Sequence, residues 1–259
     1  MNKPINISSN HKMESVIHIK GLQMSFGALD VLKGIDLEVY KGENVGVLGK
    51  SGSGKSVLIK LMIGLLKPKA GQVQVLGLEV DQLSGRKLDE IRLKMGFSFQ
   101  SSALYDSMSV YQNLAFPLTM NVLDLTKKDV DDAIEEVLTA VNLLDKMHQM
   151  PADLSGGQRK RIGIARTLIL KPEIMLYDEP TSGLDPVTSA EINELILEVQ
   201  SKYNTSSVII THDLTCAKTT CNRIAMLVDG QFLKVGSFED VFNSKDEQII
   251  SFYNYNFIQ

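Results

Sequence analysis

A glycine-rich octapeptide that follows an apolar run constrains the fold of this chain more than any other feature. Residues 43–48 are strand-like and lead directly into it. The octapeptide fits the pattern G-x-x-x-x-G-K-[ST] with Gly49, Lys50, Ser51, Gly52, Ser53, Gly54, Lys55 and Ser56. Glycines let backbone N–H groups crowd around phosphate oxygens, and a helix that begins there directs its positive end at them. The pattern therefore predicts a strand, a phosphate-binding loop and a helix, in that order.

Two side chains of the octapeptide and two acids elsewhere indicate nucleotide chemistry. We expect Lys55 to reach the β- and γ-phosphates of a nucleoside triphosphate, and the Ser56 hydroxyl to bind Mg²⁺. The apolar run 174–177 ends in Asp178 and Glu179, at the sheet edge where α/β folds bind ligands. We expect Asp178 to join the Mg²⁺ site and Glu179 to polarise the attacking water as general base. The alternative is a pair of solvated acids at a strand end.

Strand-like and helix-like segments alternate along most of the chain, which predicts a mainly parallel sheet covered by helices. The expected strands are residues 16–20, 31–40, 43–48, 72–76, 96–99, 173–177 and 206–211, with a hairpin formed by 223–228 and 232–235. The expected helices begin near residue 54 and cover 88–95, 155–170 and 186–202. The sheet is interrupted at about residue 100, because residues 101–153 have a helical pattern with an apolar stripe in 127–144.

Length, charge and hydropathy exclude several classes of protein. A chain of 259 residues can bury one large core with an inserted subdomain. A net charge of −4 gives no broad attraction for nucleic acid, so we expect no nucleic-acid partner. The longest apolar stretch, 57–66, is far shorter than the ~20 residues of a membrane-spanning helix. Residues 1–15 lack the apolar core of a secretory signal, and we expect a flexible tail of a cytoplasmic protein there.

A second glycine motif, L-S-G-G-Q at residues 154–158, lies at the start of an expected helix. Ser155 and the N–H groups of Gly156 and Gly157 predict an anion site, although the octapeptide already supplies one. The two motifs together resemble those of the ATPase subunit of ATP-binding cassette (ABC) machines, over about residues 16–236. The alternative for the second motif is a purely structural glycine turn.

The resemblance implies a P-loop NTPase of the ABC ATPase type, with ATP and Mg²⁺ as cofactors. The implied α/β fold has a RecA-like, mainly parallel sheet core and an antiparallel β subdomain. A helical subdomain is inserted at about residues 101–161, and a short helical tail occupies 237–259. The family works as a head-to-tail dimer, which here implies a homodimer whose two chains enclose two ATP molecules.

The resemblance also implies roles for particular residues. Ser155, Gly156, Gly157 and Gln158 would close over the γ-phosphate held by the opposite chain. Asp185, in the sequence Ser182-Gly183-Leu184-Asp185, would belong to the loop that couples the two sites. Gln100 would contact Mg²⁺ and the water, His212 the γ-phosphate, and Phe26 the adenine ring. A solvent-facing glutamine and a core phenylalanine are the alternatives for Gln100 and Phe26.

Softer features narrow the resemblance to the ATPases of the Mla or Mkl phospholipid transporters. They are residues 101–110 and 113–118, the basic run 159–161 and the sequence Tyr177-Asp178-Glu179-Pro180. This implies an Mla-like integral membrane permease and a lipid-binding MCE-type protein as partners, with the chain peripheral on the cytoplasmic face of the inner membrane. A transporter for another solute and a soluble ABC ATPase are the alternatives.

Two surface assignments follow from the same stretches. We expect the basic run 159–161 to form a solvated helix face, and the alternative is a nucleic-acid-binding patch. Apolar residues after Gln100 either line a groove for a permease helix or form the core of the helical subdomain. Tyr105 and Met108 are the favoured groove residues.

Overall fold

The computed structural model describes residues 14–257 of the 259. The expected N-terminal tail, residues 1–15, therefore lies almost entirely outside the described part, and its last residue, Ser15, begins the first strand. Among the described residues, no helix is long and apolar enough to cross a membrane.

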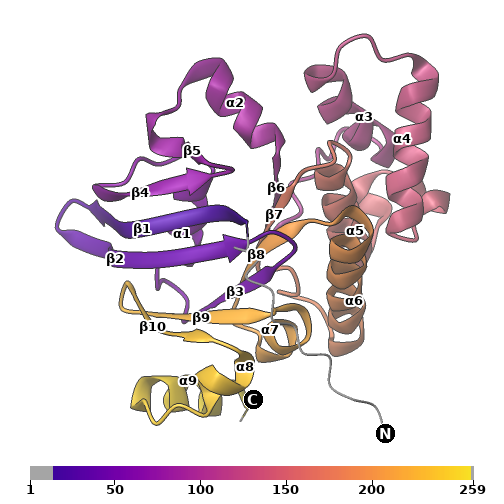
Figure 1. The fold of residues 1–259 in the computed structure, drawn as a ribbon. Helices are drawn as coiled ribbons and strands as arrows, with labels where there is room; N and C mark the ends of the chain where they lie inside the picture. Colours follow the sequence, from indigo (N-terminus) through magenta and orange to yellow (C-terminus); the bar gives the residue numbers. More distant parts are fainter. Residues whose placement is uncertain (1–13, 258–259) are drawn as a thin grey trace, which may run out of the picture.

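The larger sheet has the strand order β10-β9-β3-β8-β7-β6 within the described residues (Figure 1). Its strands are β3 (Asn44–Leu48), β6 (Met95–Ser98), β7 (Ile174–Asp178), β8 (Ser206–Thr211), β9 (Arg223–Val228) and β10 (Gln231–Gly236). All pairs are parallel except β9 with β10, which form the expected hairpin. Asp229 and Gly230 in its turn both have positive φ, as a two-residue hairpin turn of this kind requires. The predicted mainly parallel core is confirmed.

The smaller sheet is antiparallel, with the order β2-β1-β4-β5. It comprises β1 (Ser15–Phe26), β2 (Leu29–Tyr40), β4 (Ala70–Val75) and the two-residue β5 (Leu78–Glu79). The first strand is longer than the predicted 16–20, because residues after Gly21 continue to pair with β2 through register shifts. This extension carries Phe26 to the end of the strand.

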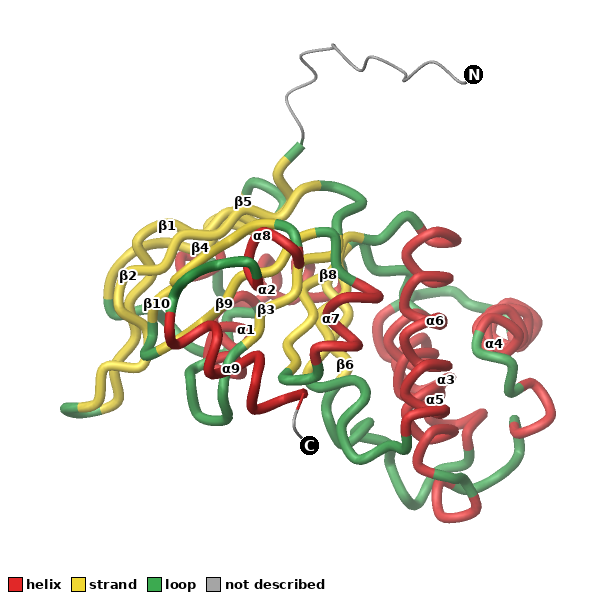
Figure 2. The backbone as a smooth tube through the Cα atoms, turned by 90° about the horizontal axis from the view of Figure 1, so that it is seen from below, coloured by secondary structure: helices red, strands yellow, loops and turns green. Residues whose placement is uncertain are grey.

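Helices surround the larger sheet and fill the insertion (Figure 2). They are α1 (Lys55–Met62), α2 (Gly85–Leu93), α3 (Val110–Asn121), α4 (Lys127–Ala140), α5 (Gly156–Leu168), α6 (Pro186–Tyr203), α7 (Leu214–Thr220), α8 (Phe238–Phe242) and α9 (Glu247–Phe257). The prediction of a helix over 88–95 was wrong at both ends: α2 begins after Ser84, and Met95 already pairs with Ile174 in the sheet. Helix α7 was not predicted.

Strand β7 shows why both sheet faces are covered. Ile174 and Leu176 pack into a cluster shared with the smaller sheet and α1, whereas Met175 and Tyr177 pack into the cluster of the helices α3–α6. Successive residues of a strand face opposite sides, so a strand buried on both faces is apolar throughout. The carboxyl end of β7 therefore lies between these two hydrophobic clusters, and the candidate site is at this end.

The C-terminal helices pack near the phosphate loop. Phe252 and Ile249 of α9 are buried in a third cluster with Leu48, the last residue of β3, and with Met226 of β9. The helix α9 lies below the hairpin of β9 and β10 in Figure 1. The expected helical tail thus packs against strands of the larger sheet.

Candidate nucleotide-binding site

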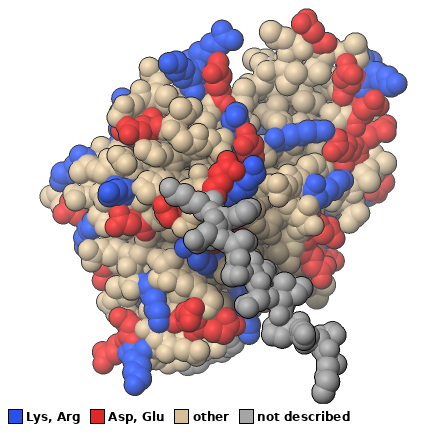
Figure 3. Space-filling view, in the orientation of Figure 1, with Lys and Arg blue, Asp and Glu red and all other residues tan. Residues whose placement is uncertain are grey.

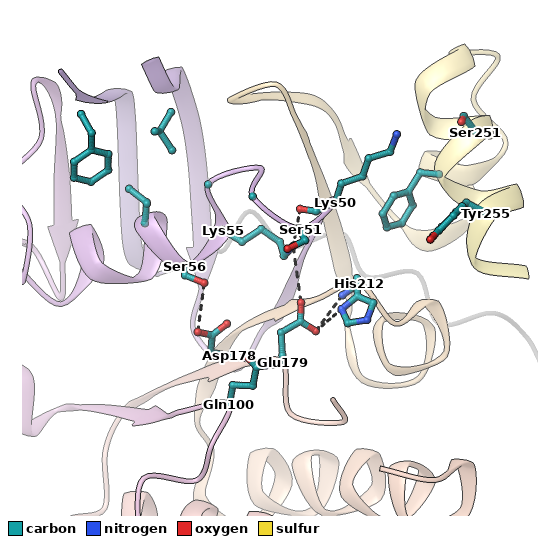
Figure 4. Close-up of a pocket in the computed structure, with 16 residues that line it drawn as sticks. Lys50, Ser51, Lys55, Ser56, Gln100, Asp178, Glu179, His212, Ser251 and Tyr255 are labelled. Carbon is teal, nitrogen blue, oxygen red and sulfur yellow. Dashed lines mark hydrogen bonds and ion pairs between the residues drawn. The ribbon is translucent and has the colours of Figure 1, made fainter. Parts of the chain in front are cut away.

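A cavity of about 940 Å³ lies where the strands β3, β7 and β8 end. Residues from the phosphate loop, from α1, from the ends of β1 and β7, and from α9 surround it. The lining includes Phe26, Lys50, Ser51, Gly52, Gly54, Lys55, Ser56, Gln100, Asp178, Glu179, His212, Ser251, Phe252 and Tyr255. Figure 4 shows Lys55, Ser56, Gln100, Asp178, Glu179 and His212 close together, with Ser251 and Tyr255 of α9 to one side. Most residues that the sequence assigns to phosphate, metal and catalysis are therefore brought together.

The shape of the phosphate loop depends on its glycines. A Cβ atom on Gly49 would lie 2.4 Å from the carbonyl oxygen of Leu227, so no larger residue fits without movement of β9. Gly54 has φ of 104°, a conformation that favours glycine. Lys55 is 7% exposed, and its Nζ donates to the carbonyl oxygens of Gly49 at 2.7 Å and Lys50 at 3.1 Å. The lysine thus folds across the loop with its charge facing the cavity.

The acid pair ends β7 in two different conformations. Asp178 accepts a long hydrogen bond from the Ser56 hydroxyl at 3.5 Å. Burial raises the pKa of Asp178 above its ordinary value, and the negative charge of Glu179 raises it further. Glu179 has φ of 50°, in the left-handed region that few residues other than glycine adopt. This turn separates the directions of the two carboxylates.

The Glu179 carboxylate lies between two potential cations. Its Oε1 is 3.8 Å from Nζ of Lys55, and its Oε2 is 2.8 Å from Nδ1 of His212. The backbone N–H of His212 also donates to Oε2 at 3.3 Å. Figure 4 shows the carboxylate reaching from the end of β7 toward both side chains. The alternative of two solvated strand-end acids is wrong for Glu179, whose side chain is 12% exposed.

Gln100 and Phe26 both line the cavity. Nε2 of Gln100 donates to the Ser182 hydroxyl at 3.1 Å, which joins the segment after β6 to the loop before Asp185. Phe26 lines the cavity and is 48% exposed, so the alternative of a core phenylalanine is wrong. Contact of Phe26 with adenine stays a prediction.

The L-S-G-G-Q motif begins α5 as predicted, but it lies outside the cavity lining among the described residues. Ser155 Oγ accepts from the N–H of Gln158 at 3.2 Å, and Gln158 Oε1 accepts from the N–H of Ser155 at 2.9 Å. A Cβ on Gly157 would lie 2.4 Å from Cγ2 of Thr188 on α6, so this glycine also has a packing role. Ser155 and Gly156 are exposed.

Asp185 caps the helix α6 within its own chain. Its carboxylate accepts from the N–H groups of Val187 and Thr188, both at 3.0 Å, and from the Thr188 hydroxyl at 2.6 Å. These hydrogen bonds lower the pKa of Asp185, the Thr188 hydroxyl contributing most. The resemblance implies that Asp185 belongs to the loop that couples the two sites and contributes to nucleotide binding, and this role stays a prediction.

Sequence reasoning missed two contributors to the site. The expectation of a solvated face at residues 159–161 was wrong for Lys160, which is 9% exposed and donates to backbone oxygens of Gln100 and Glu179. Lys160 lies four residues before Ile164 and eight before Leu168, and this helical spacing, which places it on an apolar face of α5, is the signal that could have identified it. The second contributor is α9, which supplies Ser251, Phe252 and Tyr255.

A phosphate loop between β3 and α1, an acid pair ending β7 and a helical insertion after β6 define an ATP hydrolase of the P-loop class. The chain belongs to the ABC transporter family, whose model matches residues 32–182. It is an ATP-binding subunit of that family, and the resemblance drawn from the two glycine motifs is confirmed.

Curated relatives cover most of the chain. The methionine import ATP-binding protein MetN of Carboxydothermus hydrogenoformans is 40% identical over 88% of this chain and 68% of its own length. The probable ribonucleotide transport ATP-binding protein mkl of Mycobacterium leprae is 38% identical over 93% of this chain and 70% of its own length.

Solved structures confirm the predicted fold class. Similar folds include cbiO1 of Clostridium perfringens, part of the ABC transporter complex cbiONQ, with a TM-score of 0.82 and 28% identity over 92% of this chain and 93% of that one. The ATP-binding cassette MJ0796, in a dimeric post-hydrolysis state bound to ADP and Pi, has a TM-score of 0.78 and 30% identity over 86% and 98% of the two chains.

Proposed function

We propose that this chain energises a phospholipid transporter by hydrolysing Mg²⁺-bound ATP at a site that two copies of the chain complete together. The observation that carries the chemical part is the Glu179 carboxylate, which lies between His212 and Lys55 while Asp178 and Ser56 lie beside it. In this proposal Glu179 accepts a proton from the attacking water, and His212 orients Glu179 and contacts the γ-phosphate.

The residues beside Glu179 suit a magnesium ion. The raised pKa of Asp178 reflects a negative charge that burial and a neighbouring carboxylate disfavour, and a divalent cation would offset both. Mg²⁺ is bound in nucleotide sites through one or two protein oxygens together with substrate phosphates and water. Among the described residues, no group of three or more His, Cys, Asp or Glu side chains is placed to hold a metal ion. When bound, Mg²⁺ would neutralise charge that develops on the phosphates.

The exposed L-S-G-G-Q motif supports a head-to-tail homodimer. Its Ser155 and Gly156 face solvent at the start of α5, where N–H groups of a helix N-terminus favour an anion. The phosphate loop of the same chain already has such a helix end in α1. The most economical use of the second anion site is the γ-phosphate held by another copy.

A mixing experiment tests the shared site. Lys55→Ala removes the phosphate-binding lysine, and Ser155→Arg places a bulky cation in the second motif. Neither variant alone should hydrolyse ATP, whereas heterodimers in a mixture contain one intact site. If the variants mix at random, about one quarter of the wild-type rate should return. Absence of recovery, with heterodimers verified by differential tags, would contradict action between chains.

A permease would bind near the segment that follows Gln100. Tyr105 is 43% exposed, its ring lies edge-on to that of Phe116 with centroids 5.5 Å apart, and the Arg166 guanidinium lies 4.7 Å from its ring centre. Val110 is fully buried and Leu104 packs against the helical core, so the apolar residues divide between groove and core. Tyr105 remains a favoured groove residue, and Met108 is half-buried.

The phospholipid substrate rests on the resemblance of residues 101–110, 113–118, 159–161 and 177–180 to the Mla and Mkl ATPases. The same resemblance suggests an Mla-like permease, an MCE-type lipid-binding partner and a place on the cytoplasmic face of the inner membrane. Nucleic acid is not proposed as a partner, since Lys and Arg side chains are scattered among acids on the face in Figure 3.

Methionine import is the second candidate, because MetN proteins are among the relatives at about the same identity. A deletion strain separates the two. Loss of this chain should shift phospholipid between the membranes and leave methionine uptake unchanged. The opposite result would replace the lipid proposal with solute import. Co-purification of a multi-spanning membrane protein with the tagged chain tests the permease in either case.

A further inference from the structure

Lys160 is a buried cation that neither the phosphate nor the metal chemistry uses. It lies on α5, one turn after the L-S-G-G-Q motif begins that helix. Its Nζ donates to the carbonyl oxygen of Gln100 at 2.6 Å and to that of Glu179 at 3.1 Å. Burial lowers the pKa of Lys160, while the charges of Glu179 and Asp178 raise it in part. Burying an ammonium group is unfavourable unless its hydrogen bonds are made, so this placement requires a compensating arrangement.

The hydrogen bond from Lys160 holds the backbone of Glu179, whose conformation is strained. Glu179 adopts a positive φ that is costly for a side chain with a Cβ. Its N–H donates to the carbonyl oxygen of Ile210 on β8 at 2.8 Å, and its own carbonyl accepts from Lys160. The backbone of Glu179 is therefore held from the sheet on one side and from α5 on the other. These two hydrogen bonds fix the backbone from which the Glu179 carboxylate extends.

The same face of α5 holds the whole segment around Gln100. A Cβ on Gly163 would lie 3.0–3.2 Å from atoms of Ser102, which shows how closely the backbones approach. Arg166 Nη1 donates to the carbonyl oxygen of Ala103, and the Thr167 hydroxyl donates to that of Phe97 at 3.4 Å. Residues three and four apart share one face of a helix, so these contacts form one continuous stripe with Lys160.

We propose that Lys160 is a positioning residue that sets the Glu179 carboxylate and ties it to the Gln100 segment and to the helix of the L-S-G-G-Q motif. A rotation of α5 when a second chain binds that motif would then move the backbone carbonyls of Glu179 and Gln100 together. This inference rests on the proposed role of Glu179 as general base. Lys160 itself touches neither the phosphates nor the water.

A double-mutant cycle on the full-length chain tests the proposal. Lys160→Met keeps the length of the side chain and removes its donors. It should lower kcat for ATP hydrolysis about 10- to 100-fold, with KM for ATP changed by no more than about twofold. In a Glu179→Gln background, followed by single-turnover hydrolysis with excess enzyme, the same change should alter the rate by no more than about twofold.

The controls separate positioning from folding. Lys171→Met removes an exposed lysine that pairs with Glu136 at 3.0 Å, and it should leave the kinetics unchanged. If Lys160→Met does not fold, Lys160→Gln retains an amide N–H₂ donor group, and its smaller loss should also be confined to the chain with Glu179 intact.

Two outcomes would overturn the inference. An equal loss from Lys160→Met in both backgrounds, or a raised KM with unchanged kcat, would mean that Lys160 does not act through Glu179. Failure of the general-base assignment has a different signature, because Glu179→Gln alone would then leave the rate of hydrolysis unchanged.

Discussion

Both glycine motifs present backbone N–H groups at the start of a helix, but one lines a cavity and the other is exposed to solvent. The octapeptide lies between β3 and α1, with Gly49 wedged against β9 and Lys55 nearly buried at the cavity wall. The L-S-G-G-Q motif lies at the exposed start of α5, where Ser155 and Gln158 form a capping box. An exposed helix start that does not line the cavity of its own chain suits a surface that another molecule completes. We infer from this difference that each chain supplies the octapeptide's half of one ATP site and the L-S-G-G-Q half of another.

The largest effect is expected from the acid that serves the octapeptide's half of the site. Glu179→Gln removes the proposed general base and should lower turnover by ~10² to 10⁴. ATP affinity should change little, because the amide keeps the size of the side chain. Steady-state hydrolysis and equilibrium nucleotide binding measure the two quantities. Unchanged hydrolysis would show that another group activates the water.

Lys55→Ala and Ser155→Arg should differ in their effect on ATP affinity, because the two residues belong to different motifs. The lysine lies within the cavity of its own chain, so its loss should weaken ATP binding by about 10² or more, even when the protein is monomeric. Ser155→Arg should leave the affinity of the monomer unchanged, since its motif lies outside that cavity. Titration of dilute protein with a fluorescent ATP analogue distinguishes the variants. Equal losses of affinity would contradict the division of labour between the motifs.

The part of this division that depends on local pattern could be predicted from the sequence. The octapeptide, the acids ending β7 and the histidine ending β8 each follow an apolar strand, and parallel strands bring such ends together. The part that depends on long-range packing could not. A lysine in a basic run is ordinarily solvated, and only the contacts of α5 with Gln100 and Glu179 explain why Lys160 is buried.

The C-terminal part teaches the same lesson. Apolar residues in 237–257 indicate helices, yet nothing local directs α9 toward the phosphate loop. Phe252 and Ile249 pack in one cluster with Leu48 of β3, which lies just over two hundred positions earlier in the chain. Helix α7 was missed for a different reason: its 7 residues are too few to show a helical period, although its N-cap is local, since Asp213 accepts from the N–H groups of Thr215 and Cys216.

The pH dependence of metal binding should sharpen the account of the octapeptide side. Asp178 must be ionised to bind Mg²⁺, and its raised pKa means that protons compete at a higher pH than for an ordinary aspartate. Mg²⁺ affinity in the presence of ATP should therefore fall as the pH is lowered toward that pKa, by about tenfold per pH unit below it. Asp178→Asn should bind Mg²⁺ weakly at every pH. A wild-type profile as flat as that of the variant would remove Asp178 from the metal site.

The smallest expected effect concerns whether α9 belongs to the octapeptide's site at all. Tyr255 lines the cavity and keeps 65% of its surface exposed, so it has area to offer a nucleotide without supporting the fold. Tyr255→Ala should weaken ATP binding about threefold, the size of one partly exposed aromatic contact, and leave the melting temperature unchanged. Ile250→Ala is the matched control, because Ile250 is exposed on the same helix and lies outside the cavity lining. Equal ATP affinities of the two variants would mean that the nucleotide contacts only the octapeptide, the acid pair and His212. A loss of affinity in Tyr255→Ala alone would mean that helix α9 also contributes to each chain's half of the site.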